Sequence, residues 1–261
     1  EILLDDVIGI NASGSREIKY GKTVNWVLSL ELINGKGEIL NLNKFDLSDV
    51  IGMEGITGVI TKARLKLIDK VERTASIYSF DSIEKVIEFA KKLKLTENIG
   101  FIELYDKLTS SLLGFEDKYH IIVEFDCQGG RLSKDKYKEA LSLRKKAYYL
   151  LSTLGNTILE DPKIFLDKLL ELSEFLEENK VPYFADLGSG VIHPVFSKEQ
   201  KDLIPIMLDY IRKLHGKVAG KFGIGIKKKQ YFDNIEKSIP IFQERNLMAN
   251  HFFIAHDVVW W

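Results

Sequence analysis

The sequence predicts an α+β fold, and three features support that prediction. The first 70 residues are rich in strand-like runs and turn residues. From about residue 71, short apolar strands alternate with long amphipathic helices. Two strand–helix–strand units, around 76–126 and 182–219, could pair into one antiparallel sheet with helices on one face. We therefore expect two domains, 1–70 and 71–261, because 261 residues suffice for two cores.

Composition excludes several functional classes. Lys and Arg number 37 against 38 Asp and Glu, so the net charge of −1 gives no reason to expect nucleic acid or an anionic membrane as a partner. No apolar run approaches the roughly 20 residues that cross a bilayer. A single cysteine, Cys127, excludes an intrachain disulfide or a cysteine-rich metal site. With no visible signal peptide, we expect a cytoplasmic protein.

In the first region the pattern predicts a small β unit. Residues 24–33 have the composition of a strand, and Asn34 with Gly35 is the strongest short hairpin signal. Residues 38–42 return as the partner strand. Residues 57–68 alternate apolar and polar side chains, which is typical of a strand buried on one face.

The second region begins with a helix predicted from Asp81 and Glu84, which resemble a capping box. Residues 100–104 and 120–125 are apolar strand candidates, and 133–154 is a long helix.

Further along the chain, Pro162 suits the first turn of another helix. Strands are expected at 182–187 and 191–196, then a helix that ends near Leu214 and a short one near 233–246.

Two glycine-containing segments of the first region carry the most specific signal. They are GINASG at 9–14, followed by KYG at 19–21, and GMEGITGVIT at 52–61. Small residues let backbone N–H groups approach an anion or a ring edge where a side chain would clash. Each segment alone fits a surface turn, and neither matches the G-x-G-x-x-G fingerprint.

Together these segments resemble the second half of the flavin domain of FAD-linked oxidases. These are the vanillyl-alcohol oxidase or PCMH-type flavoproteins, in the branch of D-lactate dehydrogenases and the glycolate oxidase FAD subunit. The resemblance implies a partial PCMH-type FAD-binding domain over 1–70. A ferredoxin-like α+β cap, or substrate, domain would follow over 71–261, with a C-terminal segment that returns toward the flavin. The first part of the flavin domain is missing, and the chain starts at Glu1, so we expect a truncated or cleaved product.

The resemblance also implies FAD as cofactor. Ser13 stands where the family has glycine, and the glycines equally fit a tight strand entry without a ligand. The family's cofactor-binding positions fall on Gly9, Asn11, Ala12, Ser13, Gly14, Tyr20, Gly21, Gly55, Gly58, Val59 and Ile60.

The segment ADLGSGVIHP at 185–194 resembles the family's H-x-G-D-G-N-L-H-P. His193 matches the second histidine, and Asp186 replaces the first. In metal-dependent members these histidines and a later glutamate bind a divalent ion. Asp186 could still ligate, but a lone histidine near glycines is more often structural, so we predict no metal site.

Residues 218–228 resemble G-E-H-G-I-G-x-x-K, with Lys221 at the glutamate and Phe222 at the histidine. That histidine is the family's proposed general base, and phenylalanine cannot accept a proton. Lys228 matches the trailing lysine, although 227–229 also fits a solvated run. Arg144 falls where the family has an arginine near the substrate carboxylate, although an exposed helical arginine is the commoner case. The predicted catalytic residues are His193, Arg144 and Lys228.

Three functions remain open. The first is an FAD-dependent oxidoreductase, or a subunit of one, that oxidises a small 2-hydroxy acid such as D-lactate or glycolate. A protein partner would accept its electrons or supply the missing half of the flavin domain. The second is a non-catalytic structural subunit of a larger redox complex, favoured by the residues at 186, 221 and 222. The third is an α+β ligand-binding module without flavin.

Overall fold

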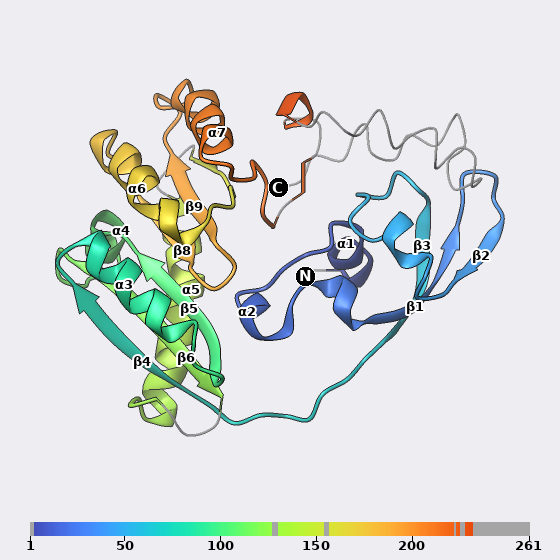
Figure 1. The fold of residues 1–261 in the computed structure, drawn as a ribbon, viewed down its shortest axis with the longest axis horizontal. Helices are drawn as coiled ribbons and strands as arrows, with labels where there is room; N and C mark the ends of the chain where they lie inside the picture. Colours follow the sequence, from blue (N-terminus) through green and yellow to red (C-terminus); the bar gives the residue numbers. More distant parts are fainter. Residues whose placement is uncertain (1–2, 127–129, 154–156, 222, 225–227, 232–261) are drawn as a thin grey trace. The chain divides into compact units, whose positions relative to one another are not determined.

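The chain forms two compact units in a computed structural model that describes residues 3–126, 130–153, 157–221, 223–224 and 228–231 (Figure 1). Unit 1 comprises residues 1–14, 20–69 and 221–261, and unit 2 comprises 15–19 and 70–220. The chain therefore enters unit 2 for five residues, returns to unit 1, and then crosses again near residue 70.

Unit 1 is built on a three-stranded antiparallel sheet of order β2-β1-β3, with β1 at Val27–Ile33, β2 at Ile39–Leu42 and β3 at Val59–Leu65. The short helices are α1 (Leu4–Gly9), α2 (Glu17–Tyr20, shared with unit 2), η1 (Thr23–Trp26), η2 (Leu47–Asp49) and η4 (Lys229–Tyr231). Side chains from α1, the sheet and the η2 region form its core: Ile8, Val27, Leu30, Leu32, Leu42, Leu47, Val50 and Ile51.

The predicted hairpin is confirmed, but its turn is longer than the Asn34–Gly35 signal indicates. Ile33 pairs with Ile39, which leaves five residues in the connection. The Asn34 side chain accepts hydrogen bonds from the backbone N–H groups of Lys36 (2.9 Å) and Glu38 (3.0 Å). Gly37, at φ +81°, supplies the left-handed conformation.

Unit 2 is built on a six-stranded antiparallel sheet of order β4-β6-β5-β8-β9-β7. Its strands are β4 (Arg73–Phe80), β5 (Ile99–Tyr105), β6 (Tyr119–Asp126), β7 (Ile158–Leu159), β8 (Tyr183–Asp186) and β9 (Val191–Phe196). Its helices are α3 (Ile83–Leu93), α4 (Lys107–Leu112), α5 (Lys134–Thr153), η3 (Leu166–Lys168), α6 (Leu169–Glu178) and α7 (Leu203–Lys213).

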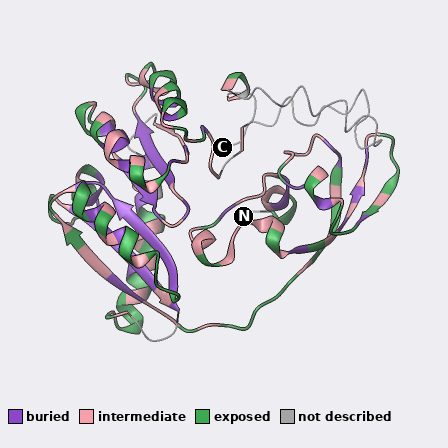
Figure 2. Cartoon of the chain, in the orientation of Figure 1, coloured by how far each residue is buried: buried purple, intermediate pink, exposed green. Residues whose placement is uncertain are grey.

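Helices cover both faces of this sheet, so the expectation of helices on one face is wrong. Helix α5 packs on one face through Ala140, Ala147 and Leu151, whereas α3 and α6 lie across the other (Figure 1). Strands β5 and β6 are buried along nearly their whole length (Figure 2). A strand without an exposed face needs cover on both sides.

Three other local predictions need correction. Residues around Pro162 are extended, not helical, because Lys163 bridges both Val191 and Lys217. Ser82, not Asp81, is the N-cap of α3. Strands β8 and β9 form a hairpin that α7 follows, so the second unit is not strand–helix–strand. The helix predicted near 233–246 falls outside the described residues.

Asp106 is a buried carboxyl group at the N-cap of α4. Its Oδ1 accepts hydrogen bonds from the N–H groups of Thr109 (2.9 Å) and Tyr183 (3.2 Å). Its Oδ2 is buried and has no hydrogen-bond partner among the described residues. Burial raises the pKa of Asp106 to about 6, although the hydrogen bonds at Oδ1 oppose that rise.

Asp106→Asn should remove a pH dependence of stability. Because the folded-state pKa is raised, this carboxyl group stabilises the fold below about pH 4, and that contribution is lost as the pH rises through about 6. The wild type should therefore lose about 2–3 kcal/mol relative to the variant between these limits. Urea unfolding from pH 4 to 7 measures the difference, with the exposed Asp117→Asn as control. Parallel pH profiles for wild type and Asp106→Asn would contradict the assignment.

Candidate functional site

In unit 1 the two glycine segments lie against each other. The N–H of Gly52 donates to the carbonyl of Ile8 (3.2 Å), and the N–H of Glu54 donates to the carbonyl of Gly9 (2.9 Å). A Cβ at Gly52 would lie 3.1 Å from the Cβ of Asn11, so a larger residue would push the two loops apart. The structure thus brings the 9–14 and 52–60 segments together.

The 9–14 loop is also fixed from the segment that follows it. Asn11, at φ +48°, accepts a hydrogen bond from the Val24 N–H through Oδ1 (3.0 Å). Thr23 Oγ1 donates to the carbonyl of Ala12 (2.7 Å). Tyr20 meets Trp26 edge to face at 5.7 Å, and its carbonyl accepts from the indole Nε1 (2.8 Å). Rigid backbone on both sides of the loop is what a preorganised ligand site requires.

Two buried hydroxyl groups mark these segments as a place for a polar ligand. Ser13 is 7% exposed and Thr57 is 1% exposed. Neither Ser13 Oγ nor Thr57 Oγ1 has a hydrogen-bond partner among the residues that the structure describes. Burying a hydroxyl group without a hydrogen-bond partner is unfavourable, so such a group indicates that a bound molecule supplies the partner. Small residues with hydroxyl donors between them fit a phosphate-bearing cofactor.

A third segment reaches the same turn. The N–H of Ile224 donates to Glu54 Oε1 (2.6 Å), and a Cβ at Gly223 would lie 2.6 Å from that oxygen. Lys228 lies directly before the short helical turn η4, and its N–H donates to the carbonyl of Ile224 (3.2 Å). Phe222 falls outside the described residues. Glu54 thereby joins the 52–60 turn to the described part of the 218–228 motif.

In unit 2 the predicted residues gather on the α5 face of the sheet. Cross-strand partners share a face, and the register pairs Tyr105 with Phe184 and Phe184 with His193. The next row pairs Glu103 with Asp186. His193 is 5% exposed and its ring stacks on Phe184 at 4.7 Å.

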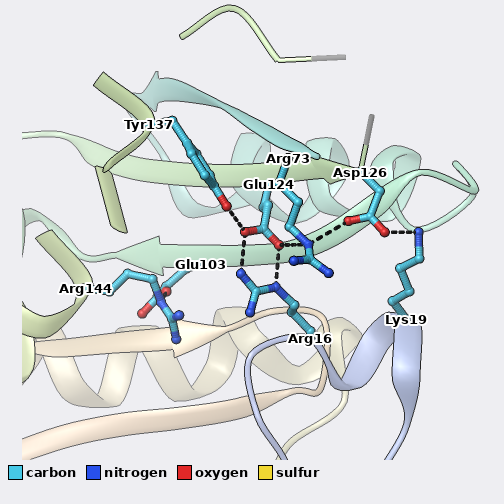
Figure 3. A network of polar contacts seen from close by, with 8 residues as sticks. All are labelled: Arg16, Lys19, Arg73, Glu103, Glu124, Asp126, Tyr137 and Arg144. Carbon is cyan, nitrogen blue, oxygen red and sulfur yellow. Dashed lines mark hydrogen bonds and ion pairs between the residues drawn. The ribbon is translucent and has the colours of Figure 1, made fainter. Parts of the chain in front are cut away.

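Arg144 projects from α5 onto this face and forms an ion pair with Glu103 (Figure 3). Its guanidinium lies 4.9 Å over the ring of Phe101. Burial lowers the pKa of Arg144, but the charge and hydrogen bond of Glu103, together with the charges of Tyr105 and Asp186, leave the pKa above its usual value. The Glu103 side chain is 5% exposed. Arg144 is therefore a paired, partly buried arginine and not an exposed helical one.

Asp186 caps the turn between β8 and β9. Its Oδ1 accepts hydrogen bonds from the N–H groups of Gly188 (3.1 Å) and Ser189 (3.2 Å). Among the described residues, no group of three or more His, Cys, Asp or Glu side chains is arranged to hold a metal ion.

The chain resembles known proteins over most of its length. It is 24% identical to a D-2-hydroxyglutarate dehydrogenase of Stutzerimonas stutzeri, over 87% of this chain and 62% of that protein. It is 22% identical to the glycolate oxidase subunit GlcD of Bacillus subtilis, over 87% of this chain and 60% of that protein. A solved alkyldihydroxyacetonephosphate synthase superposes with a TM-score of 0.61 at 14% identity, covering 94% of this chain and 56% of that one.

Over most of its length the chain is similar to FAD-linked oxidoreductases. The resemblance inferred from the glycine segments is thus confirmed, and so is the α+β fold class of a partial PCMH-type domain followed by a cap. No protein-family model matches the sequence. The chain spans about three fifths of the length of the curated relatives named above. No helix in the described ranges is long and apolar enough to cross a membrane.

The predicted site residues fall into two groups. All the predicted cofactor-binding residues lie in unit 1, where Val59 and Ile60 open β3 and Gly21 has φ +69°. Of the predicted catalytic residues, His193 and Arg144 lie in unit 2 and Lys228 lies in unit 1.

Sequence reasoning missed three acidic residues of this arrangement. Glu54 was read only as part of a glycine motif, yet its carboxylate binds the 223–224 backbone. Glu103 and Glu124 interrupt otherwise apolar strands, and each is buried against an arginine. A charged residue inside a buried strand pattern is the signal that could have identified them, because such charges are seldom buried without a partner.

Proposed function

We propose that unit 1 is part of an FAD-binding domain and unit 2 is the cap domain of an FAD-dependent oxidoreductase. The observation that carries the proposal is the approach of the 9–14 and 52–60 loops, which contain the buried hydroxyls of Ser13 and Thr57 without a hydrogen-bond partner among the described residues. Bound FAD would supply hydride acceptance. The relatives, a D-2-hydroxyglutarate dehydrogenase and a glycolate oxidase subunit, favour a small 2-hydroxy acid as substrate.

The proposal assigns distinct roles to residues of this chain. His193, the histidine of the 185–194 motif, is assigned as the proton acceptor, and its ring is oriented by stacking on Phe184. Glu103 accepts from Arg144 Nε, so the terminal guanidinium nitrogens are assigned to the substrate carboxylate. Lys228 is assigned to bind an anionic group of the ligand through its positively charged ammonium.

A non-catalytic subunit is the alternative that a specific observation favours. The Asp186 carboxylate accepts a hydrogen bond from the N–H of Gly188 in its own turn, and Arg144 forms an ion pair with Glu103. Phenylalanine at position 222 removes the family's proposed base. The protein partner, as electron acceptor or as source of further flavin-domain residues, and a cytoplasmic location are part of both proposals and rest on the sequence alone.

Anaerobic mixing of the FAD-loaded protein with D-lactate, glycolate and D-2-hydroxyglutarate tests the proposal. We expect the wild type to reduce its flavin slowly, and Phe222→His to accelerate reduction by about 100-fold because an imidazole restores general base catalysis. Phe222→Leu is the matched control and should stay slow.

Rapid reduction of the wild type by D-lactate or glycolate would contradict the expected cost of Phe222. If FAD binds and none of the acids reduces it even in Phe222→His, the non-catalytic subunit is the better account.

A further inference from the structure

Residues 15–19 belong to unit 2, although the residues on both sides of them belong to unit 1. They follow the 9–14 loop directly and lead into Tyr20 and Gly21. Helix α2, which overlaps them, contains no buried residue. Figure 3 shows Arg16 and Lys19 of this segment in polar contact with Glu124 and Asp126 of β6.

Glu124 on β6 is the centre of these contacts. Its side chain is fully buried, and one edge of the Arg16 guanidinium binds both carboxylate oxygens: Nε lies 2.6 Å from Oε1 and Nη2 lies 2.7 Å from Oε2. Tyr137 of α5 donates its hydroxyl to Oε2 (2.6 Å), and Arg73 Nε lies 3.6 Å from Oε1. A bidentate arginine–carboxylate pair fixes orientation as well as distance.

The rest of the segment is held on neighbouring strands. Lys19 forms an ion pair with Asp126, whose other oxygen lies 3.0 Å from Arg73 Nε. Burial raises the pKa of Asp126, but the hydrogen bonds and charges of Lys19 and Arg73 bring it below its usual value. Glu17 lies 3.1 Å from Lys163 Nζ.

We propose that Glu124 is a positioning residue for the proposed flavin loop. By holding Arg16 it fixes the end of the 9–14 loop, although Glu124 itself lies in unit 2 and is not among the predicted cofactor-binding residues. The positioning role rests on the proposed function, because it matters for FAD only if the 9–14 loop binds it. The anchoring itself is independent of any cofactor.

Hydrogen–deuterium exchange of the FAD-free protein tests the anchoring. Glu124→Gln and Arg16→Gln should each speed amide exchange over residues 9–22 by about ten-fold, the change expected when a charge-assisted hydrogen bond is lost. The double variant should be no faster than either single one, because both remove the same pair. Tyr137→Phe is the matched control: it removes the hydrogen bonds of this hydroxyl to Glu124 and Arg16 but leaves the Arg16–Glu124 ion pair, so exchange over 9–22 should rise much less than in Glu124→Gln.

FAD titration of the same variants tests positioning. Glu124→Gln and Arg16→Gln should weaken FAD binding by about ten-fold, and Tyr137→Phe should not. The anchoring is overturned if exchange over 9–22 is the same in Glu124→Gln and wild type, or rises equally in Tyr137→Phe. The positioning role is overturned if exchange rises but FAD affinity does not fall. If the wild type binds no FAD, the proposed function fails, and the exchange data alone decide the anchoring.

Discussion

Gly58→Ala should destabilise unit 1 by about 3 kcal/mol or more and abolish FAD binding. Gly58 has φ +142°, a region that L-residues rarely adopt. A Cβ there would lie 2.4 Å from the carbonyl oxygen of Ile33 and 3.1 Å from Leu32 Cγ. Because the first of these atoms is backbone of the paired strand β1, the clash can be relieved only by moving β3 away from the sheet.

Gly55→Ala is the matched control for this substitution. Gly55 also has positive φ (+79°), but a Cβ there would meet no atom within 4 Å. Its cost should be limited to the left-handed backbone, about 1 kcal/mol. Urea unfolding followed by circular dichroism measures both variants. A Gly58→Ala midpoint equal to that of Gly55→Ala would show that the close approach of Gly58 and Ile33 is not a constraint.

Arg144→Leu should cost about 3–5 kcal/mol of folding free energy. The substitution leaves Glu103, whose side chain is 5% exposed, as a buried charge without its guanidinium. It also removes the contact of the guanidinium with the Phe101 ring. The Arg144→Leu/Glu103→Leu double variant should recover most of this loss, since an apolar pair can replace a buried ion pair at little cost.

Lys92→Leu provides a matched control, because Lys92 forms an exposed ion pair with Glu88 one helical turn away. Its effect should stay below about 0.5 kcal/mol. Thermal unfolding of the four proteins gives the comparison. If Arg144→Leu is no more destabilising than Lys92→Leu, the Arg144–Glu103 pair is not a buried charge cluster, and its assigned role on the α5 face loses its basis.

The glycine motifs could be predicted from sequence because their information is local. Gly52, Gly55 and Gly58 all adopt positive φ, a backbone conformation that favours glycine at the position itself. The same holds for the β1–β2 hairpin, where Asn34 bonds to residues two and four positions ahead. Locally determined features of this kind carried the resemblance to FAD-linked oxidases, and that resemblance implied the fold class.

The arrangement around α5 could not be predicted, because it depends on contacts between distant residues. Arg16 and Glu124 are 108 positions apart, and nothing in either local sequence indicates the other. Helix α5 buries Tyr137 and Arg144 against acidic residues of the sheet, so its inner side is not a purely apolar stripe. For this reason the sequence pattern of α5 did not indicate that this helix covers a second face of the sheet.

The prediction of a helix at Pro162 was wrong for a related reason. Proline suits a first helical turn, but tertiary pairing overrides local preference. Lys163 exchanges backbone hydrogen bonds with Lys217 at 2.7 Å, and the Asp161 carboxylate accepts the Gly220 N–H at 3.1 Å. Partners more than 50 positions away determine this conformation.

Titration of the purified, flavin-free chain with FAD tests the central claim most directly. The account predicts saturable binding of one FAD per chain, monitored by quenching of flavin fluorescence, and weaker binding when the buried hydroxyls are removed in Ser13→Ala and Thr57→Val. Asp117→Asn, at an exposed site in unit 2, should bind as the wild type does. No saturable binding by the wild type, or binding that neither hydroxyl substitution weakens, would contradict the assignment of FAD to these loops.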